Sequence, residues 1–283
     1  MFSAILPLYG VRFEMVFTES STPGQFHQGA LTAWLRTVLG NSEHFTNCMC
    51  LESLQNQSHF KTGDVYRFAV LGIGAQGKDL IARIPSEILM CRPCWDSAMP
   101  FRDNWLLRSI SHVDGTPLQS LSEVPEVLNT ALLQQQVAQL QTWTHITMRI
   151  NTPLRVLKDL GNRQKMRGEQ RYCHEVRDLM TDHLWLTRIL DTLRKLIENH
   201  AGELPTIHIP ASLIAKAEMH WVNASYKSSV RKIQPMGGLI GHIEIDDVVN
   251  WSPELLAALV AGSYFGFGQR RVFGNGRYQL HER

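Results

Sequence analysis

The stretch whose residues could most directly do chemistry lies near the end of the chain, at residues 262–278. It holds five glycines, three arginines and five aromatic residues. Glycine lets the backbone adopt positive φ and approach a ligand closely, and guanidinium groups bind phosphate oxygens. The combination predicts a loop that grips a phosphate backbone such as that of RNA. The alternative is a glycine-rich hairpin whose arginines are merely solvated.

The segments around this loop are predicted to be a helix and a strand. Residues 251–261 are typical of a short helix, with Ser252 and Pro253 at its start. Residues 271–280 are typical of a strand. The loop is therefore expected to join the last helix of the chain to its last strand.

Three motifs occur in order along the second half of the chain. They are Thr152-Pro153-Leu154-Arg155, then Trp221 with Ser229, Arg231 and the pair Gly237-Gly238, and finally Phe273-Gly274-Asn275-Gly276-Arg277-Tyr278. In this order and spacing the chain resembles the CRISPR repeat-processing endoribonucleases of the RAMP superfamily, most clearly over residues 140–283. The resemblance implies an α+β fold of two tandem ferredoxin-like domains, with a glycine-rich loop and a helical projection in the second domain.

The resemblance also implies an activity, the cleavage of stem-loop repeat RNA without a metal or cofactor. The ribose 2′-hydroxyl attacks the adjacent phosphate and leaves a cyclic phosphate and a 5′-hydroxyl. This reaction needs proton-transfer groups and cations for the developing charge. His27 and His44 lie where many members place a catalytic histidine, and Arg36 lies between them. His27 is expected to transfer the proton and Arg36 to stabilise charge, whereas the alternative for either histidine is a surface or capping residue.

One departure from the family pattern concerns the loop itself. Relatives with this ending often carry a histidine and a lysine where this chain has Gly266 and Gln269. Arg270 and Arg271 can supply charge there, but a guanidinium stays protonated and is a poor general base. A noncatalytic RNA-binding subunit on the same fold is therefore the alternative to a nuclease that retains its product.

Basic residues form the expected RNA contacts, together with the loop glycines. Residues 155–171 have a local excess of cations, which could track phosphates along an A-form stem. The alternative is a solvated basic face. The expected RNA-binding residues are Arg155, Arg163, Lys165, Arg167, Arg231, Lys232, Gly266, Gly268, Arg270, Arg271, Gly274 and Gly276. The expected partners are CRISPR repeat RNA or crRNA and other CRISPR effector subunits.

Composition sets the outer bounds. The chain has 283 residues, 44% of them hydrophobic, which is enough to bury a core. Its net charge of +2 neither requires nor excludes nucleic acid as a ligand. No apolar run reaches the length of a membrane span, and the N-terminus lacks a signal-peptide layout. These features predict a cytoplasmic protein without a membrane partner.

Five cysteines without a secretion signal predict reduced thiols. Cys48 and Cys50, with Cys91 and Cys94, could supply four thiolates to one zinc ion if the fold brings the two pairs together. The alternative is that they are small buried residues.

Hydrophobic periodicity predicts two similar halves, 1–139 and 140–283. In the first half, 11–17, 64–73 and 105–113 have the period of strands, and 27–39 and 78–90 that of helices, with Pro85 expected to kink the second. Residues 130–139 are expected to be helix or linker. In the second half the strands are expected at 146–150, 220–224, 239–245 and 271–280, with a helix or helical pair within the basic segment 155–199 and another helix at 251–261. Strand, helix, two strands, helix, strand is the ferredoxin-like order.

A competing motif occurs at residues 72–77, Gly-Ile-Gly-Ala-Gln-Gly, which matches a dinucleotide-binding fingerprint between a strand and a helix. Doubly wound parallel sheets have strands that are apolar throughout, whereas 11–17 and 65–70 carry charged residues. The glycines are therefore interpreted as a tight turn between strand and helix.

Overall fold

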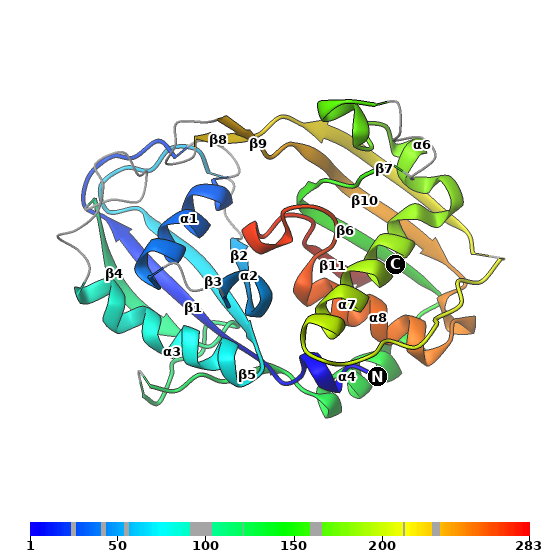
Figure 1. Ribbon diagram of the computed structural model, residues 1–283, viewed down its shortest axis with the longest axis horizontal. Helices are drawn as coiled ribbons and strands as arrows, with labels where there is room; N and C mark the ends of the chain where they lie inside the picture. Colours follow the sequence, from blue (N-terminus) through cyan, green and yellow to red (C-terminus); the bar gives the residue numbers. More distant parts are fainter. Residues whose placement is uncertain are drawn as a thin grey trace.

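The computed structural model describes residues 1–23, 27–40, 44–53, 57–90, 104–120, 122–158, 166–211, 213–227 and 233–283. These residues form two lobes, each a sheet with helices packed against it (Figure 1). Within the described residues, no helix is both long and apolar enough to cross a bilayer. Several residues of the sequence-based predictions fall outside the described part, namely Arg163, Lys165, Arg231, Lys232, Cys91 and Cys94.

The N-terminal lobe is a ferredoxin-like unit. Its elements are β1 (Leu8–Phe17), α1 (Gln28–Val38), α2 (Phe45–Cys48), β2 (Met49–Ser53), β3 (Val65–Ile73), α3 (Gly74–Met90), β4 (Trp105–Ser111) and β5 (Glu126–Leu128). The strands follow the order β2-β3-β1-β4, and β5 pairs with β1. All these pairs are antiparallel.

Alternation along β1 explains how this lobe forms its core. Val11, Phe13, Met15 and Phe17 are buried, whereas Arg12 and Glu14 point to the opposite face. The buried residues belong to one cluster with the apolar sides of α1 and α3, where Trp34 meets Trp105 edge to face. The helices therefore cover one face of the sheet, and the other face meets the C-terminal lobe through Leu8, Cys50 and Leu71, which belong to that lobe's core cluster.

The turn between β3 and α3 is built by close backbone contact. A Cβ on Gly72 would lie 2.6 Å from the carbonyl oxygen of Gly77, and a Cβ on Gly77 would overlap Gly72. Since the sheet is antiparallel rather than doubly wound, the glycine motif here is a tight strand-to-helix turn, as interpreted from the sequence.

The C-terminal lobe repeats the same plan. Its elements are β6 (His145–Leu154), η3 (Gly168–Arg171), α6 (Val176–Met180), η4 (Thr181–His183), α7 (Leu184–Asn199), β7 (Ala215–Val222), β8 (Ser225–Lys227), β9 (Ile233–Pro235), β10 (Gly238–Asp246), η5 (Val248–Asn250), α8 (Pro253–Phe265), η6 (Arg271–Phe273) and β11 (Tyr278–Glu282). The sheet order β11-β6-β10-β7 matches that of the first lobe, and its pairs are antiparallel. The predicted α+β fold with two ferredoxin-like domains is confirmed.

Several predicted elements differ from the observed ones. Residues 49–53 form β2, where the sequence analysis expected no strand. Residues 271–273 form a 3₁₀ turn rather than a strand, because glycines at positive φ follow directly, and β11 begins only at Tyr278. Pro85 lies inside α3 without ending it. The segment 169–199 is a set of short helices followed by α7, since Asp182 and His183 adopt positive φ.

Two peripheral segments pack onto the C-terminal lobe. The helix α4 (Thr130–Leu140) begins at Asn129, whose side chain accepts a hydrogen bond from the Leu132 N–H at 2.9 Å, and it contacts α8. The short η1 turn (Ser3–Ile5) contacts α7. Residues of both segments belong to the core cluster of the second sheet. The division of the chain near residue 140 stays a prediction.

The β3–α3 turn allows a matched pair of substitutions. Gly77→Ala should lower the free energy of unfolding by on the order of 3 kcal/mol, because its Cβ overlaps backbone that cannot move independently. Gly74→Ala should cost only about 1 kcal/mol, since Gly74 has φ +60 but no atom near its missing Cβ. Urea denaturation measures both, and equal losses would contradict this account of the turn.

Candidate nucleic-acid interface

The glycine-rich loop leaves α8 and returns to β11 through a compact turn. Gly266, Gly268, Gly274 and Gly276 all have positive φ, between +67 and +84. The loop closes on itself where the Phe267 N–H donates to the Gly276 carbonyl at 3.1 Å. A side chain at Gly276 would collide with the Phe267 carbonyl. These positions therefore require glycine to form the loop at all, whatever the loop binds.

The loop lies against the N-terminal lobe. Its η6 turn contacts α1 and β2, and a Cβ on Gly274 would be 2.7 Å from the Leu51 carbonyl oxygen. Gln28, the first residue of α1, is completely buried beside Gly274, and its side-chain amide atoms have no hydrogen-bond partner among the described residues. The loop thus belongs to the second lobe by sequence and closes onto the first.

Arg277 joins the lobes at the end of this loop. Its Nη2 donates to the Glu52 carboxylate on β2 at 2.7 Å, while its Nη1 donates to the Tyr264 carbonyl of α8. Its backbone N–H donates to the Thr152 hydroxyl at 2.9 Å. The two charged side chains are only 11% and 20% exposed, so each depends on the other for compensation.

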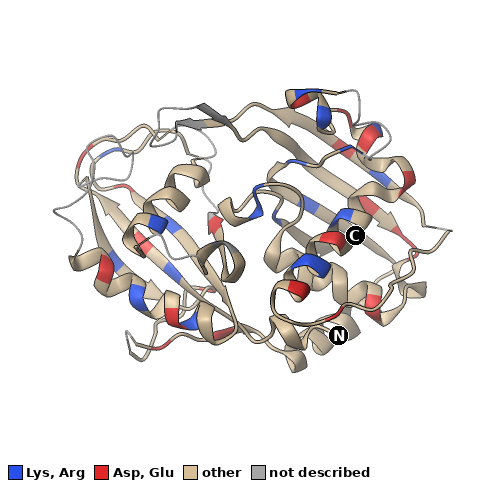
Figure 2. Cartoon of the chain, in the orientation of Figure 1, with Lys and Arg blue, Asp and Glu red and all other residues tan. Residues whose placement is uncertain are grey.

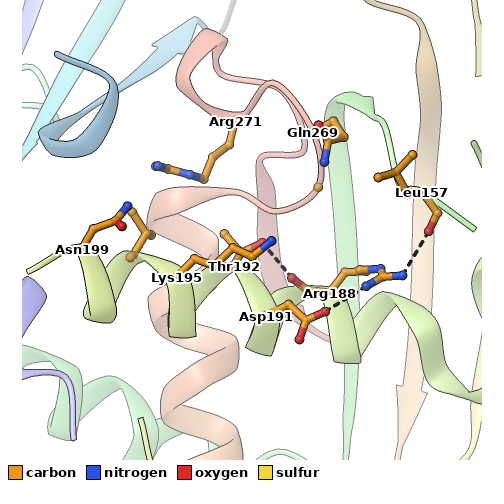
Figure 3. A pocket seen from close by; sticks show the side chains of 10 residues that line it. Leu157, Arg188, Asp191, Thr192, Lys195, Asn199, Gln269 and Arg271 are labelled. Atoms are coloured by element: carbon orange, nitrogen blue, oxygen red, sulfur yellow. Dashed lines mark hydrogen bonds and ion pairs between the residues drawn. The ribbon is translucent and has the colours of Figure 1, made fainter. Parts of the chain in front are cut away.

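A pocket of ≈ 350 Å³ lies between the loop and α7 (Figure 3). We call it the α7 pocket. Its polar and charged lining residues are Arg188, Asp191, Thr192, Lys195, Asn199, Gln269 and Arg271. In Figure 2 the cations of α7 lie over the C-terminal lobe, and those of the loop lie on the side of that lobe nearest the N-terminal lobe.

The charges of the α7 pocket are not balanced. Asp191 accepts from Arg188 at 2.9 Å and from Arg194 at 3.1 Å, so two guanidinium groups already share its charge. Neither Arg271 nor Lys195 has an ion-pair partner within the described residues. Burial lowers the pKa of Arg271, and the neighbouring Arg277 lowers it further. The arrangement favours an anion in the pocket.

Arg155 lies inside the lobe rather than on an RNA-facing surface. Its guanidinium donates to the Gly237 carbonyl at 3.1 Å and to the Glu169 carboxylate at 2.6 Å, and it stacks over the Tyr172 ring at 3.7 Å. Its own carbonyl accepts from the Gln269 N–H at 2.7 Å. Arg155 therefore holds the loop in place from within, and it is not free to bind phosphate as the sequence analysis expected.

The other described cations keep more exposure. Arg167 is exposed, and Arg270 is half-buried with its guanidinium 5.8 Å from the Phe273 ring centre. Both remain RNA-binding predictions.

The three residues expected to carry catalysis are not gathered at one point. His27 is 2% exposed, and its Nε2 is 2.8 Å from the Tyr66 hydroxyl inside the N-terminal lobe. Arg36 is half-buried near the far end of α1, about 13 Å from His27 along the helix axis. His44 is exposed where α2 begins.

Residues that the sequence analysis missed connect these parts. His200 Nε2 is 3.3 Å from the Asn47 carbonyl, so the end of α7 meets α2 next to the pocket residue Asn199. Arg188, Asp191, Lys195 and Asn199 are three or four residues apart, a polar stripe at helical spacing opposite the apolar one. That stripe was a usable signal, because its members necessarily share one helix face.

The zinc prediction concerns two described thiols and two that lie outside the described residues. Cys48 and Cys50 are buried, and burial raises the pKa of both thiols. In the described part, no three His, Cys, Asp or Glu residues gather as a metal site. The four-cysteine proposal stays untested.

Neither a protein-family profile nor a curated protein matches the sequence. Solved structures do match the fold. A chain of a partial Cas6-RT-Cas1–Cas2 complex is 22% identical with a TM-score of 0.74, and the match covers 98% of this chain and 46% of that chain. A product complex of a Thermus thermophilus Cas6 is 15% identical with a TM-score of 0.55, covering 97% of this chain and 99% of that one. An RAMP protein that binds different RNA substrates is 12% identical with a TM-score of 0.52, covering 97% and 100%.

These comparisons define the class of fold. The chain has the tandem ferredoxin-like fold of RAMP proteins, as the three sequence motifs predicted. More particularly, it has the fold of Cas6 structures. It spans less than half the length of the Cas6-RT-Cas1–Cas2 chain that it resembles.

The ion pair between the lobes gives a prediction for stability. Glu52→Gln should lower the free energy of unfolding by about 2–3 kcal/mol, because it leaves the Arg277 guanidinium without its counter-charge. Glu175→Gln is the matched control, since its pair with Arg177 is 68% and 83% exposed and should matter by less than about 1 kcal/mol. Urea denaturation measures both, and the double variant Glu52→Gln, Arg277→Met should recover only part of the loss, because the Tyr264 carbonyl also loses its guanidinium donor. A single variant as stable as the control would show that the pair does not hold the lobes.

Proposed function

We propose that the protein is an endoribonuclease that processes CRISPR precursor RNA at stem-loop repeats. The observation that carries the proposal is the pair of uncompensated cations, Arg271 and Lys195, beside a glycine-rich loop on a Cas6-type fold. The similarity to Cas6 structures supports the class of substrate. The loop and pocket support contact with its phosphates.

The chemistry proposed is attack of the ribose 2′-hydroxyl on the adjacent phosphate without a metal. The new 2′-O–P bond forms as the bond to the 5′ oxygen breaks, which leaves a 2′,3′-cyclic phosphate and a 5′-hydroxyl. One group takes the 2′ proton, another gives a proton to the leaving oxygen, and cations stabilise the phosphorane-like charge. Arg271 is suited to the last role, since it is half-buried at the loop and lacks a carboxylate partner in the described structure.

The proton-transfer group is proposed to come from the N-terminal lobe, because the loop has Gly266 and Gln269 where relatives carry histidine and lysine. Exposure supports His44, whose α2 helix meets the end of α7. The burial of His27 against Tyr66 weighs against a direct role. His27 could reach RNA only if the start of α1 opened.

The noncatalytic alternative, a crRNA-binding subunit on the same fold, is favoured by the glycine and glutamine in the loop. If the protein cuts the repeat, it retains the cleaved RNA, because phosphate contacts persist after one bond is cut. Association with other CRISPR proteins is proposed because a chain of similar fold is part of a Cas6-RT-Cas1–Cas2 complex.

Two cations on different helices test RNA binding in the α7 pocket. Lys195→Ala should weaken repeat RNA binding about tenfold at low salt and reduce the salt slope by about one, because one phosphate contact is lost. Arg83→Ala is the control, since Arg83 lies on α3, pairs with Glu87 and does not line the pocket. Filter binding across a salt series measures both. Equal effects would argue for general charge attraction and against the pocket.

A second prediction separates the histidines. His44→Ala should keep repeat affinity and slow single-turnover cleavage by roughly a hundred- to ten-thousandfold, as expected for a lost proton-transfer group. His27→Ala should lower thermal stability through loss of the Tyr66 contact but retain cleavage. Cleavage should persist in chelator. If His27→Ala abolishes cleavage in a stably folded protein while His44→Ala does not, His27 is the proton-transfer residue instead of His44. If the wild-type protein binds repeat RNA without cutting it, the noncatalytic alternative holds.

A further inference from the structure

An imidazole and an indole stack at the surface on the helix side of the C-terminal sheet. The rings of His174, just before α6, and Trp221, near the end of β7, are 3.8 Å apart between centroids and tilted by only 22°. The Trp221 Nε1 donates to the Asn223 side chain at 3.0 Å, and His174 Nε2 is 3.0 Å from the Glu169 carbonyl. Both rings are thus fixed in orientation by polar contacts at their edges.

The side chain of His174 is exposed. Among the described residues it stacks on Trp221, and its Nε2 lies 3.0 Å from the Glu169 carbonyl oxygen. Trp221 is half-buried against the core cluster, and a Cβ on Gly237 would lie 3.3 Å from its ring. A flat group could therefore add to the stack only on the His174 side.

The surroundings of the stack carry unpaired positive charge. Arg167 and Arg171 are exposed on either side of Glu169, and neither has an ion-pair partner within the described residues. The Glu169 carboxylate is already held by Arg155 at 2.6 Å. An aromatic surface beside free guanidinium groups matches the two chemical parts of a nucleotide, the base and the phosphate.

A short chain of contacts links this stack to the glycine-rich loop. Arg155 donates to Glu169, which carries the carbonyl next to His174, and to Gly237, which packs under Trp221. The carbonyl of Arg155 accepts from the Gln269 N–H in the loop. One buried arginine thus fixes the stack relative to the loop.

We propose that the His174–Trp221 stack is a platform for one unpaired nucleobase of the bound RNA. The base lies on the outer face of His174, and Arg167 and Arg171 contact the phosphates that flank it. Because every base has a π-face and no base-edge partner is needed, the platform is tolerant of sequence. This inference rests on the proposed RNA-binding function and adds to it a contact outside the loop and the α7 pocket.

The test uses a seven-nucleotide oligoadenylate RNA with 2-aminopurine at its centre, and the same oligonucleotide with an abasic site there. Wild-type protein should quench the fluorescence and bind the base-containing probe more tightly than the abasic one. His174→Ala should weaken binding of the base-containing probe by roughly five- to hundredfold, with little effect on the abasic probe. His174→Phe should restore binding, because it restores a flat ring. His208→Ala, which removes an exposed histidine in a loop, should have no effect.

The outcomes separate this proposal from the proposed function. Equal binding of the base-containing probe by wild type and His174→Ala overturns the platform, as does an equal loss for both probes, which would mean a backbone or folding effect. No quenching by wild type overturns it as well. Cleavage of a repeat transcript is measured in parallel. If quenching depends on His174 but the transcript is not cleaved, the platform is supported and the nuclease function is overturned. If the transcript is cleaved but the probe is not quenched, the nuclease function is supported and the platform is overturned.

Discussion

The contact on which the candidate site most depends is the buried guanidinium of Arg277. It reaches the carboxylate of Glu52 in the N-terminal lobe and the carbonyl of Tyr264 at the end of α8, while its backbone bonds to Thr152 on β6. The guanidinium thus joins the loop to β2 and to the end of α8, and the backbone of the same residue joins it to β6. Because a guanidinium carries five donors in a rigid plane, it can satisfy several acceptors at once where a lysine could not. The position of the loop at the junction of the lobes follows from this contact.

The loop itself has little freedom once Arg277 is placed. Its glycines at positive φ and its close backbone contacts exclude side chains from the turn, so charge has to come from arginines and from neighbouring elements. Arg271 provides it from the loop, and α7 provides Lys195 across the pocket. The site is therefore a surface shared between a backbone shaped by glycine and side chains supplied by a helix.

Local charge, rather than net charge, decides what this surface can bind. The net charge is only +2, but the charged residues are unevenly placed. Asp191, the acidic residue of the α7 pocket, pairs with two arginines among the described residues. The same holds beside the His174–Trp221 stack, where Arg155 engages Glu169. In both places a carboxylate pairs with arginines, and other cations have no ion-pair partner within the described part of the chain. This distribution gives an anionic polymer two separated points of contact on one lobe.

Local sequence patterns predicted most of the helices and strands, and the order of these elements predicted the fold class. The signals that predicted tandem ferredoxin-like units each involve only a few neighbouring residues, so they are visible in the sequence. They are the alternation along β1 and β6, the helix start at Ser252-Pro253 and the glycine motif near residue 274. The short strand β2 was not predicted, since five residues are too few to show a clear alternation of apolar and polar side chains. No local pattern showed that Arg155 lies inside, that His27 is buried against Tyr66, or that Glu52 meets Arg277 across the lobes. The physical reason is that periodicity defines which face of an element is apolar, whereas the partner of a charged side chain depends on elements far apart in the chain that meet only after the two sheets have packed together.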